Sequence, residues 1–284
     1  MQNSGSANRL EQACFYLLLF SLFWAPLPFA SNRVWSIAVL AALSGIVLFV
    51  LCALIAAGRA RVRADVWRPA AVPLVSLLMV QVWVAFQLVP LPLDLLKLLS
   101  PQAAQWHLYR EYATISLDID ATSLYLLRGL CISMAFVLTL MLVNSASRVV
   151  LFLQALVLSG LFQATYGSFM VLSGLELGFF VEKYASLGVA TGTFVNRNHL
   201  AGYLVMCLAA GIGLLIVQLK SERSGSWRPR LQEFLALMLS PTMRLRVYLA
   251  VMVIALVLTR SRMGNIAFFL SLALAGLVLI ASSK

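Results

Sequence analysis

Charged side chains are scarce in this sequence. They make up 11% of its 284 residues, whereas a soluble domain carries about 25%, which argues against a soluble protein. Histidine occurs twice and cysteine four times. The cysteines have neither paired nor metal-ligand spacing and lie inside apolar segments, at Cys14, Cys52, Cys131 and Cys207. We therefore expect small core residues there, no disulfide, no metal and no cofactor.

Apolar residues, by contrast, make up 62% of the chain. A membrane-spanning helix needs about 20 mainly apolar residues, because its backbone polar groups find no water in lipid. Eight segments fit this description: 12–30, 34–57, 70–90, 124–143, 149–173, 199–219, 246–260 and 264–281. The first is predicted to be a helix and not a cleaved signal, because "APLPFASNR" is a poor cleavage site. The sequence thus predicts an all-α polytopic helix bundle, with residues 1–284 forming one membrane-embedded domain.

Acidic residues are the scarcer of the two charges, with 10 against 21 basic residues and a net charge of +11. If the N-terminus is cytoplasmic and the segments alternate, most basic residues fall on the cytoplasmic side, as the positive-inside rule requires. These are Arg9, Arg59, Arg61, Arg63, Arg68, Arg148, Lys220, Arg223, Arg228, Arg230, Arg244, Arg246 and Lys284. We predict that both termini and a basic loop over 220–245 are cytoplasmic. The charge then sets orientation, and no nucleic-acid partner is expected.

A periplasmic loop is predicted over 91–123. Asp94 and Lys97 lie three residues apart among leucines, which places both charges on one face of a short helix at the membrane interface. The alternative is a helix that only closes the rim of the bundle. The run "TISLD" alternates like a short strand, and His107 is interpreted as a surface histidine.

A second periplasmic loop, 174–197, leads into "TGTFVNRNHLAGYL". Its polar run precedes an apolar segment, so Asn196 or Asn198 is expected to cap the following helix. Asn196, His199 and Tyr203 then share one helical face. Either these residues are only a cap and interfacial anchors, or they mark a site, because Arg and His inside a membrane usually do.

The third outer feature is "LTRSRMGN", at 258–265. Arg260 and Arg262 are about 200° apart on a regular helix, so only a break near Ser261–Gly264 would direct both into one cavity. Such a pair calls for an anion, and guanidinium groups match phosphate oxygens well. Together with Arg197, Arg128 and a helix N-terminus, they predict a site for a phosphate-bearing lipid at the outer leaflet.

These motifs resemble a known family. "TGTFVNRNHLAGYL", followed by a basic loop and "LTRSRMGN", is similar to the O-antigen ligase and polymerase superfamily of bacterial envelope proteins, and "ISLD" and "FFVEKYASLGVATGTF" resemble its ligase-like members. The resemblance covers roughly residues 85–270. It implies an inner-membrane glycosyltransferase of lipopolysaccharide biosynthesis with a periplasmic active face. Such an enzyme transfers a glycan from undecaprenyl diphosphate to a hydroxyl of a lipid or glycan acceptor.

Charge and resemblance together assign roles to individual residues. The expected donor-diphosphate ligands are Arg128, Arg197, Arg260 and Arg262, and the expected pocket-organising residues are Asn196, Asn198, His199 and Tyr203. The expected partners are the lipid-linked glycan, its acceptor and the membrane lipids. Arginines would take up charge that develops on the leaving diphosphate, which requires no metal. The catalytic residue is not identified by the motifs, and His199 is the candidate.

The family pattern continues beyond what this sequence contains. In the family, a large periplasmic loop with a histidine-rich motif and further helices follow the "TRSR" helix. This sequence ends at "VLIASSK", and His107 and His199 lie outside such a motif. We therefore expect the N-terminal, donor-binding part of a ligase-like protein, truncated or split, with little transfer activity of its own.

Two other classes fit part of the sequence. A small-anion transporter would use the same arginines, but transporters often contain inverted repeats, and none is evident here. A non-catalytic scaffold or remnant, in which the polar residues only set helix packing, is compatible with the missing histidine motif.

Overall fold

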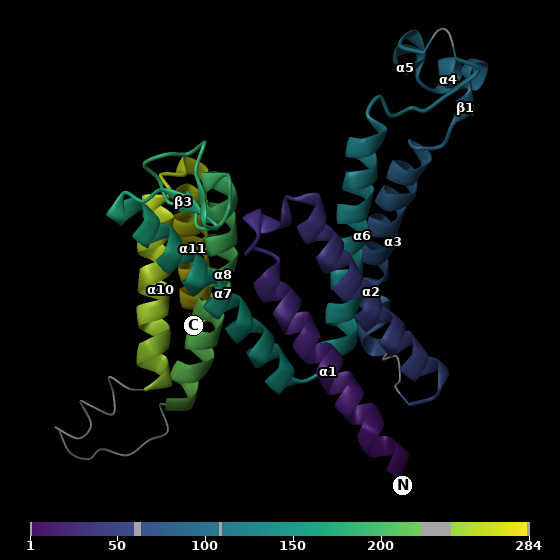
Figure 1. Ribbon diagram of the computed structural model, residues 1–284. Coiled ribbons are helices and arrows are strands. Elements are labelled where there is room, and N and C mark those ends of the chain that lie inside the picture. The colour runs from purple at the N-terminus through teal and green to yellow at the C-terminus, as the bar shows by residue number, and fades with distance from the viewer. Residues whose placement is uncertain (1, 60–63, 108–109, 223–239, 283–284) are drawn as a thin grey trace, which may run out of the picture. The chain divides into compact units, whose positions relative to one another are not determined.

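The computed structural model describes residues 2–59, 64–107, 110–222 and 240–282 (Figure 1). Apart from two short strand pairs, the regular structure of these residues is helical. The chain divides into two compact units. Unit 1 comprises Met1–Ser21 and Arg33–Asn144, and unit 2 comprises Leu22–Asn32 and Ser145–Lys284.

Unit 1 is built on long helices. They are most of α1 (Gln2–Trp24), then α2 (Val34–Ala56), α3 (Ala64–Phe86) and α6 (Ile119–Leu142). Helix α6 packs against both α2 and α3, and Figure 1 shows α3 beside α6. Between α3 and α6 the chain forms β1 (Leu91–Pro92), α4 (Leu93–Leu99), α5 (Pro101–Gln105) and β2 (Tyr112–Ala113).

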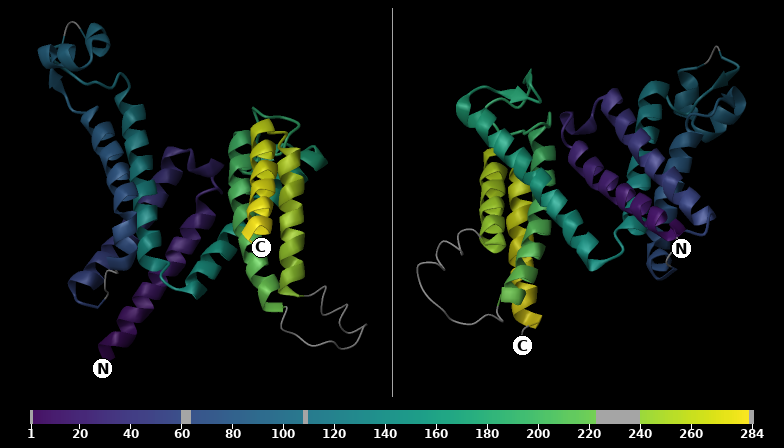
Figure 2. Two further views of the ribbon diagram at one scale, coloured as in Figure 1. Left: turned by 180° about the vertical axis from the view of Figure 1, so that it is seen from behind. Right: turned by 60° about the horizontal axis from the view of Figure 1, so that its bottom comes forward.

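Unit 2 begins with the short 3-10 helix η1 (Phe29–Ser31) and continues with α7 (Ala146–Ser173). A loop with β3 (Leu177–Gly178) and β4 (Val181–Glu182) precedes α8 (Arg197–Glu222). Helices α10 (Pro241–Leu258) and α11 (Arg262–Ser282) follow. Helices α7, α8 and α10 pack against one another, and α11 packs mainly against α8 (Figure 2).

Within the described residues, six helices are long and apolar enough to cross a membrane. They are Val34–Ala56, Asp65–Phe86, Ile119–Leu142, Ala146–Ser173, Arg197–Leu219 and Pro241–Leu258. They match six of the eight predicted segments. The last predicted segment, 264–281, falls mainly in a shorter apolar helix, Arg262–Val278, and the first, 12–30, overlaps α1 as far as Trp24. The prediction of an all-helical chain with helices of membrane-spanning length is confirmed.

Helix ends follow local capping chemistry more closely than hydrophobicity. Helix α7 begins three residues before its predicted apolar segment because the side chain of Ser145 accepts a hydrogen bond from the N–H of Arg148. Ser240 caps α10 in the same way through Met243 N. Such caps satisfy N–H groups that have no partner within the helix. Helix α1 ends at Trp24, short of the predicted residue 30, because Pro26 and Pro28 interrupt the chain there.

The short helix predicted around Asp94 and Lys97 exists as α4, and its place at a membrane interface stays a prediction. Lys97 Nζ donates to Asp94 Oδ1 at 2.9 Å, so both charges share one face. The strand predicted for "TISLD" is wrong, because β2 stops at Ala113 and Thr114 Oγ1 bonds to the carbonyl of Ser116 two residues on. A polar side chain that bonds to the nearby backbone favours a turn over a strand.

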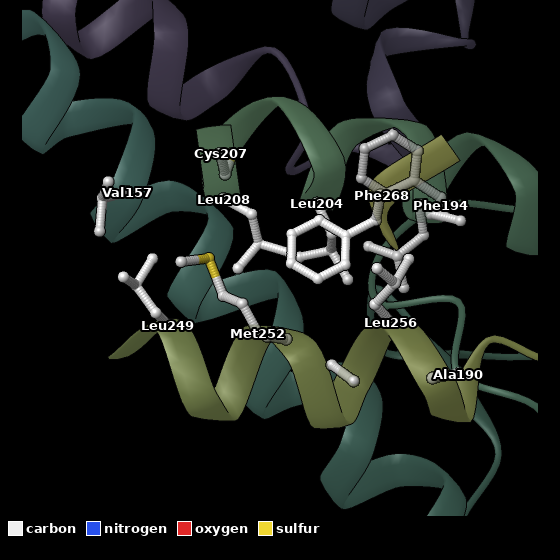
Figure 3. Close-up of a cluster of buried hydrophobic side chains, with 14 of the residues drawn as sticks. Val157, Ala190, Phe194, Leu204, Cys207, Leu208, Leu249, Met252, Leu256 and Phe268 are labelled. Carbon is white, nitrogen blue, oxygen red and sulfur yellow. The ribbon is translucent and has the colours of Figure 1, made fainter. Parts of the chain in front are cut away.

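The core of unit 2 lies where α7, α8 and α10 meet (Figure 3). A Cβ atom on Gly160 of α7 would lie 2.6 Å from Cys207 Cβ and 2.9 Å from Met252 Sδ. Glycine is therefore needed for these helices to approach closely, as is common in membrane bundles. Cys14, Cys131 and Cys207 are buried as expected, but Cys52 is exposed, contrary to the prediction of a core residue.

Candidate functional site

The starts of α8 and α11 adjoin each other in unit 2. Arg197 is the first residue of α8 and Arg262 the first of α11. A Cβ on Gly264 would lie only 2.6 Å from Ala201 Cβ, so the first turns of the two helices are in contact. Arg260 lies in the turn that leads into α11. The three predicted ligands of unit 2 thus lie at one end of it, the end that also carries β3 in Figure 1.

The helix break predicted for the "TRSR" motif is present, slightly earlier than expected. Helix α10 ends at Leu258, and Arg260 has a φ of 50°. The turn is fixed by Thr259, whose buried Oγ1 donates to the carbonyl of Leu256 at 2.6 Å and accepts from Ser261 N. A left-handed arginine costs roughly 1–2 kcal/mol and persists only where the surroundings enforce it. The strained backbone is therefore that of Arg260, one of the predicted diphosphate ligands.

Asn196 is the cap of α8, one of the two asparagines predicted for that role. Its Oδ1 accepts from Asn198 N at 2.8 Å, and its carbonyl accepts from His199 N and Leu200 N. The side chains of Arg197, Asn198 and His199 are exposed. The backbone N–H groups of Asn198, His199 and Leu200 thus already have acceptors at this helix start. An anion here would be bound chiefly by side chains.

Tyr203 points into the unit. Its hydroxyl donates to Ser159 Oγ of α7 at 2.7 Å, and its ring lies 5.5 Å from that of Phe194. Tyr203 therefore holds α8 against α7, and it acts on the exposed polar run only through the placement of α8.

A buried, non-helical segment, 189–194, fixes the start of α8 relative to the end of α10. Ala190 N donates to the carbonyl of Leu258 at 3.0 Å. Thr193 N donates to Gln163 Oε1 at 2.9 Å, and Thr193 Oγ1 donates to the carbonyl of Pro26 at 2.6 Å. Irregular backbone at membrane depth is tolerated only inside protein or at water. The motifs do not predict this network, and the one sign of it in the sequence is Gln163 within the apolar segment 149–173.

Two glycines allow this segment to pass α7. A Cβ on Gly167 would lie 2.8 Å from Gly192 N, and one on Gly192 would lie 2.6 Å from Gln163 Oε1. Gly192 also has a φ of 58°, which glycine adopts without strain. The "TGTF" of the motif is thus explained by packing.

The loop before this segment folds around an ion pair. Lys183 Nζ donates to Glu176 Oε2 and to the carbonyl of Val189, and Gly188 N donates to Glu176 Oε1. Burial opposes ionisation of Glu176, but the hydrogen bonds from Lys183 and Gly188 and the charge of Lys183 outweigh it and lower the pKa of this carboxyl. The sequence shows these charges without indicating that they pair.

The arginines at this end are uncompensated. Among the described residues, no carboxylate forms an ion pair with Arg197, Arg260 or Arg262, and all three side chains are exposed. Arg128 belongs to α6 of unit 1, where its guanidinium lies 5.6 Å from the centre of the Tyr125 ring. Its participation in the site remains a prediction. A described cavity in unit 2 lies at the other end, beside Pro241 and Arg244.

Comparison with known proteins adds no relative. No family model, no curated protein and no solved structure matches the chain. The resemblance to O-antigen ligases therefore remains a prediction, and the physical argument for the site depends on the arginines and the two adjoining helix starts.

Proposed function

We propose that the end of unit 2 that carries Arg197, Arg260 and Arg262 binds the diphosphate of an undecaprenyl-diphosphate-linked glycan. The chain would be the donor-binding part of a glycosyltransferase of the O-antigen ligase type. The observation that supports this most directly is the set of three exposed arginines, without carboxylate partners among the described residues, at two adjoining helix starts.

The charges favour a diphosphate over a smaller anion. Each arginine can donate two parallel hydrogen bonds to phosphate oxygens, and a diphosphate offers two phosphate groups to several arginines. The positive ends of α8 and α11 add to the attraction. A polyprenyl tail is also compatible with the many exposed apolar side chains of these helices, such as Met206 and Ile266, because it would lie in the bilayer.

The proposed chemistry is displacement at the anomeric carbon of the donor sugar. The bond between that carbon and the diphosphate oxygen breaks, the diphosphate leaves with the electron pair, and an acceptor hydroxyl forms the new bond. Arginines near the leaving oxygen would stabilise its developing charge, as preorganised donors do in other sites. His199, exposed two residues beyond Arg197, is the candidate base for the acceptor proton.

The orientation follows from the same charges. In the proposed topology, eight helices span a bacterial inner membrane and both termini lie in the cytoplasm. The end of unit 2 that carries Arg197, Arg260 and Arg262 then faces the periplasm. Arg244 and Arg246 lie in the first turns of α10, at the end opposite Arg260, which is where the positive-inside rule expects cytoplasmic charge.

The test is the affinity for undecaprenyl diphosphate in nanodiscs. Arg197→Ala and Arg260→Ala should each lower the affinity by about tenfold or more, because a hydrogen bond to a charged group contributes about 1.5–3 kcal/mol. Arg→Lys should lower it less, because lysine keeps the charge but not the fork. Arg246→Ala is the control, since Arg246 is also exposed but lies at the other end of unit 2.

Equal losses in the Arg246→Ala control and in the Arg197 or Arg260 variants would reduce the binding to general basicity and refute the proposal. Inorganic diphosphate should compete weakly if the polyprenyl chain contributes. If chloride, added at the same concentration of negative charge, displaces undecaprenyl diphosphate as well as inorganic diphosphate does, a small-anion transporter is favoured.

A further inference from the structure

The cavity of unit 2 beside Pro241 and Arg244 has a chemistry of its own. It has a volume of about 200 Å³ and lies between the first half of α7, the last turns of α8 and the first turns of α10. It is therefore at the end of α8 and α10 opposite Arg197 and Arg260. Neither the sequence motifs nor the proposed function assigns a role to it.

Most of the cavity wall is apolar. Val157, Leu214 and Leu245 contribute to it, and each of them is almost fully buried. Val157 belongs to the same core cluster as Leu249 and Met252 (Figure 3). Such a wall offers no favourable contact to a small hydrated anion. It can bind part of an acyl chain, because burial of apolar surface is favourable.

The wall also contains the polar side chains of Gln154, Gln218, Arg244 and Tyr248, and two of these decide which ligand fits. Gln218 Oε1 is buried and has no hydrogen-bond partner among the described residues. Leaving a buried acceptor unpaired costs about 1–3 kcal/mol, so a donor is expected there. The guanidinium of Arg244, also in the wall, forms no ion pair with any carboxylate that the structure describes.

We propose that this cavity binds an anionic phospholipid whose head group carries a hydroxyl, with phosphatidylglycerol as the simplest example. The phosphodiester accepts from Arg244, the head-group hydroxyl donates to Gln218 Oε1, and the start of one acyl chain lies against Val157, Leu214 and Leu245. The phosphodiester carries a single negative charge, so one arginine is sufficient. The positive end of α10, which begins at Pro241, lies beside it and adds to the attraction.

The membrane supplies this ligand directly. Positively charged residues at helix ends attract anionic lipids, each contributing about 1 kcal/mol near the surface. That general attraction would act equally on Arg246, which lies two residues beyond Arg244, about 200° around the helix, and takes no part in the cavity wall. The proposed site differs from this general attraction, because binding there requires the cavity as well as the charge of Arg244. It does not depend on the proposed function of the other end.

The experiment measures lipid binding by native mass spectrometry and by competition in mixed-lipid nanodiscs. The full chain is compared in phosphatidylglycerol, phosphatidylcholine and phosphatidylmethanol, the last of which has the same charge but no hydroxyl. Wild type should prefer phosphatidylglycerol to phosphatidylcholine by tenfold or more. Arg244→Gln should remove most of that preference, and Arg246→Gln should leave it unchanged. Gln218→Leu should abolish only the preference for phosphatidylglycerol over phosphatidylmethanol.

A third variant tests the cavity itself. Leu158 lines it and is half exposed, so Leu158→Trp can fill the space without disrupting the core, and thermal melting checks that the variant folds. Binding of phosphatidylglycerol should fall by tenfold or more. Unchanged binding would overturn the proposal. This is also the result expected if another segment of the same chain, and not a lipid, occupied the cavity. Equal effects of Arg244→Gln and Arg246→Gln, or full competition by deacylated glycerophosphoglycerol, would also overturn it.

Discussion

Gly264→Ala tests whether the proposed donor site depends on how closely the starts of α8 and α11 approach each other. The new Cβ would lie 2.6 Å from Ala201 Cβ, whereas carbon atoms in contact are normally about 3.5–4.0 Å apart. The two helix starts must therefore separate by about 1 Å. Overpacking of this kind costs about 1–3 kcal/mol.

The separation should also affect binding. Arg197 precedes Ala201 by about one helical turn, and Arg262 precedes Gly264 by two residues, so both arginines move with the helix starts. A misplacement of about 1 Å at a site that positions a substrate can cost up to a hundredfold. We expect the affinity for undecaprenyl diphosphate to fall by about tenfold, measured in nanodiscs beside thermal melting.

Two further variants make the result interpretable. Gly276→Ala, in the same helix but with open space around the new Cβ, reports the effect of helix propensity alone and should not weaken binding. Adding Ala201→Gly to Gly264→Ala removes the opposing methyl group and should restore both stability and affinity. If Gly264→Ala lowers the melting temperature while affinity stays at the wild-type value, the close approach of the helix starts does not serve binding.

Two other predictions concern orientation and the loop. The first uses a chain in which Cys52 is replaced and a membrane-impermeant thiol reagent is added from the periplasmic side. The reagent should label a cysteine engineered at position 184 and should not label one at position 147. The reverse pattern would invalidate the topology and the periplasmic site. Because the folded pKa of Glu176 is lowered, the stability that its ionised form gives the loop is complete above the unfolded pKa of about 4.3 and is lost as the pH falls through the folded pKa. Hydrogen-exchange protection factors of 176–190 should therefore hold from pH 7 to about 5 and then fall; Glu176→Gln should flatten this response and Glu182→Gln should preserve it.

The sequence predicts the helices well because lipid restricts the choices. A segment of about 20 apolar residues has one stable backbone conformation in a bilayer, so six segments reappear as long apolar helices. The ends are less predictable, because a single side chain decides them. The hydroxyl of Ser145 starts α7, and two prolines end α1 well before residue 30.

The candidate site was predictable in its residue types but not in its supports. A cluster of polar residues against an apolar background singled out Arg197, Arg260 and Arg262. The contacts that place them are made by residues with little chemical signature, such as Gly264 against Ala201. Pairing across 30 residues, as between Gln163 and Thr193, has no local pattern that a sequence could display.

The same supports explain why the polar run at the start of α8 need not be a flexible loop tip. Its cap, Asn196, lies two residues beyond a segment whose backbone is hydrogen-bonded to α10 through Ala190 and to α7 through Thr193. Both ties are buried, where a hydrogen bond is electrostatically stronger than in water. Arg197 and Arg260 therefore extend from a rigid frame, and only their side chains must be ordered when an anion binds. A rigid frame lowers the entropic cost of binding, which is why we expect these exposed arginines to discriminate between a diphosphate and a diffuse negative surface.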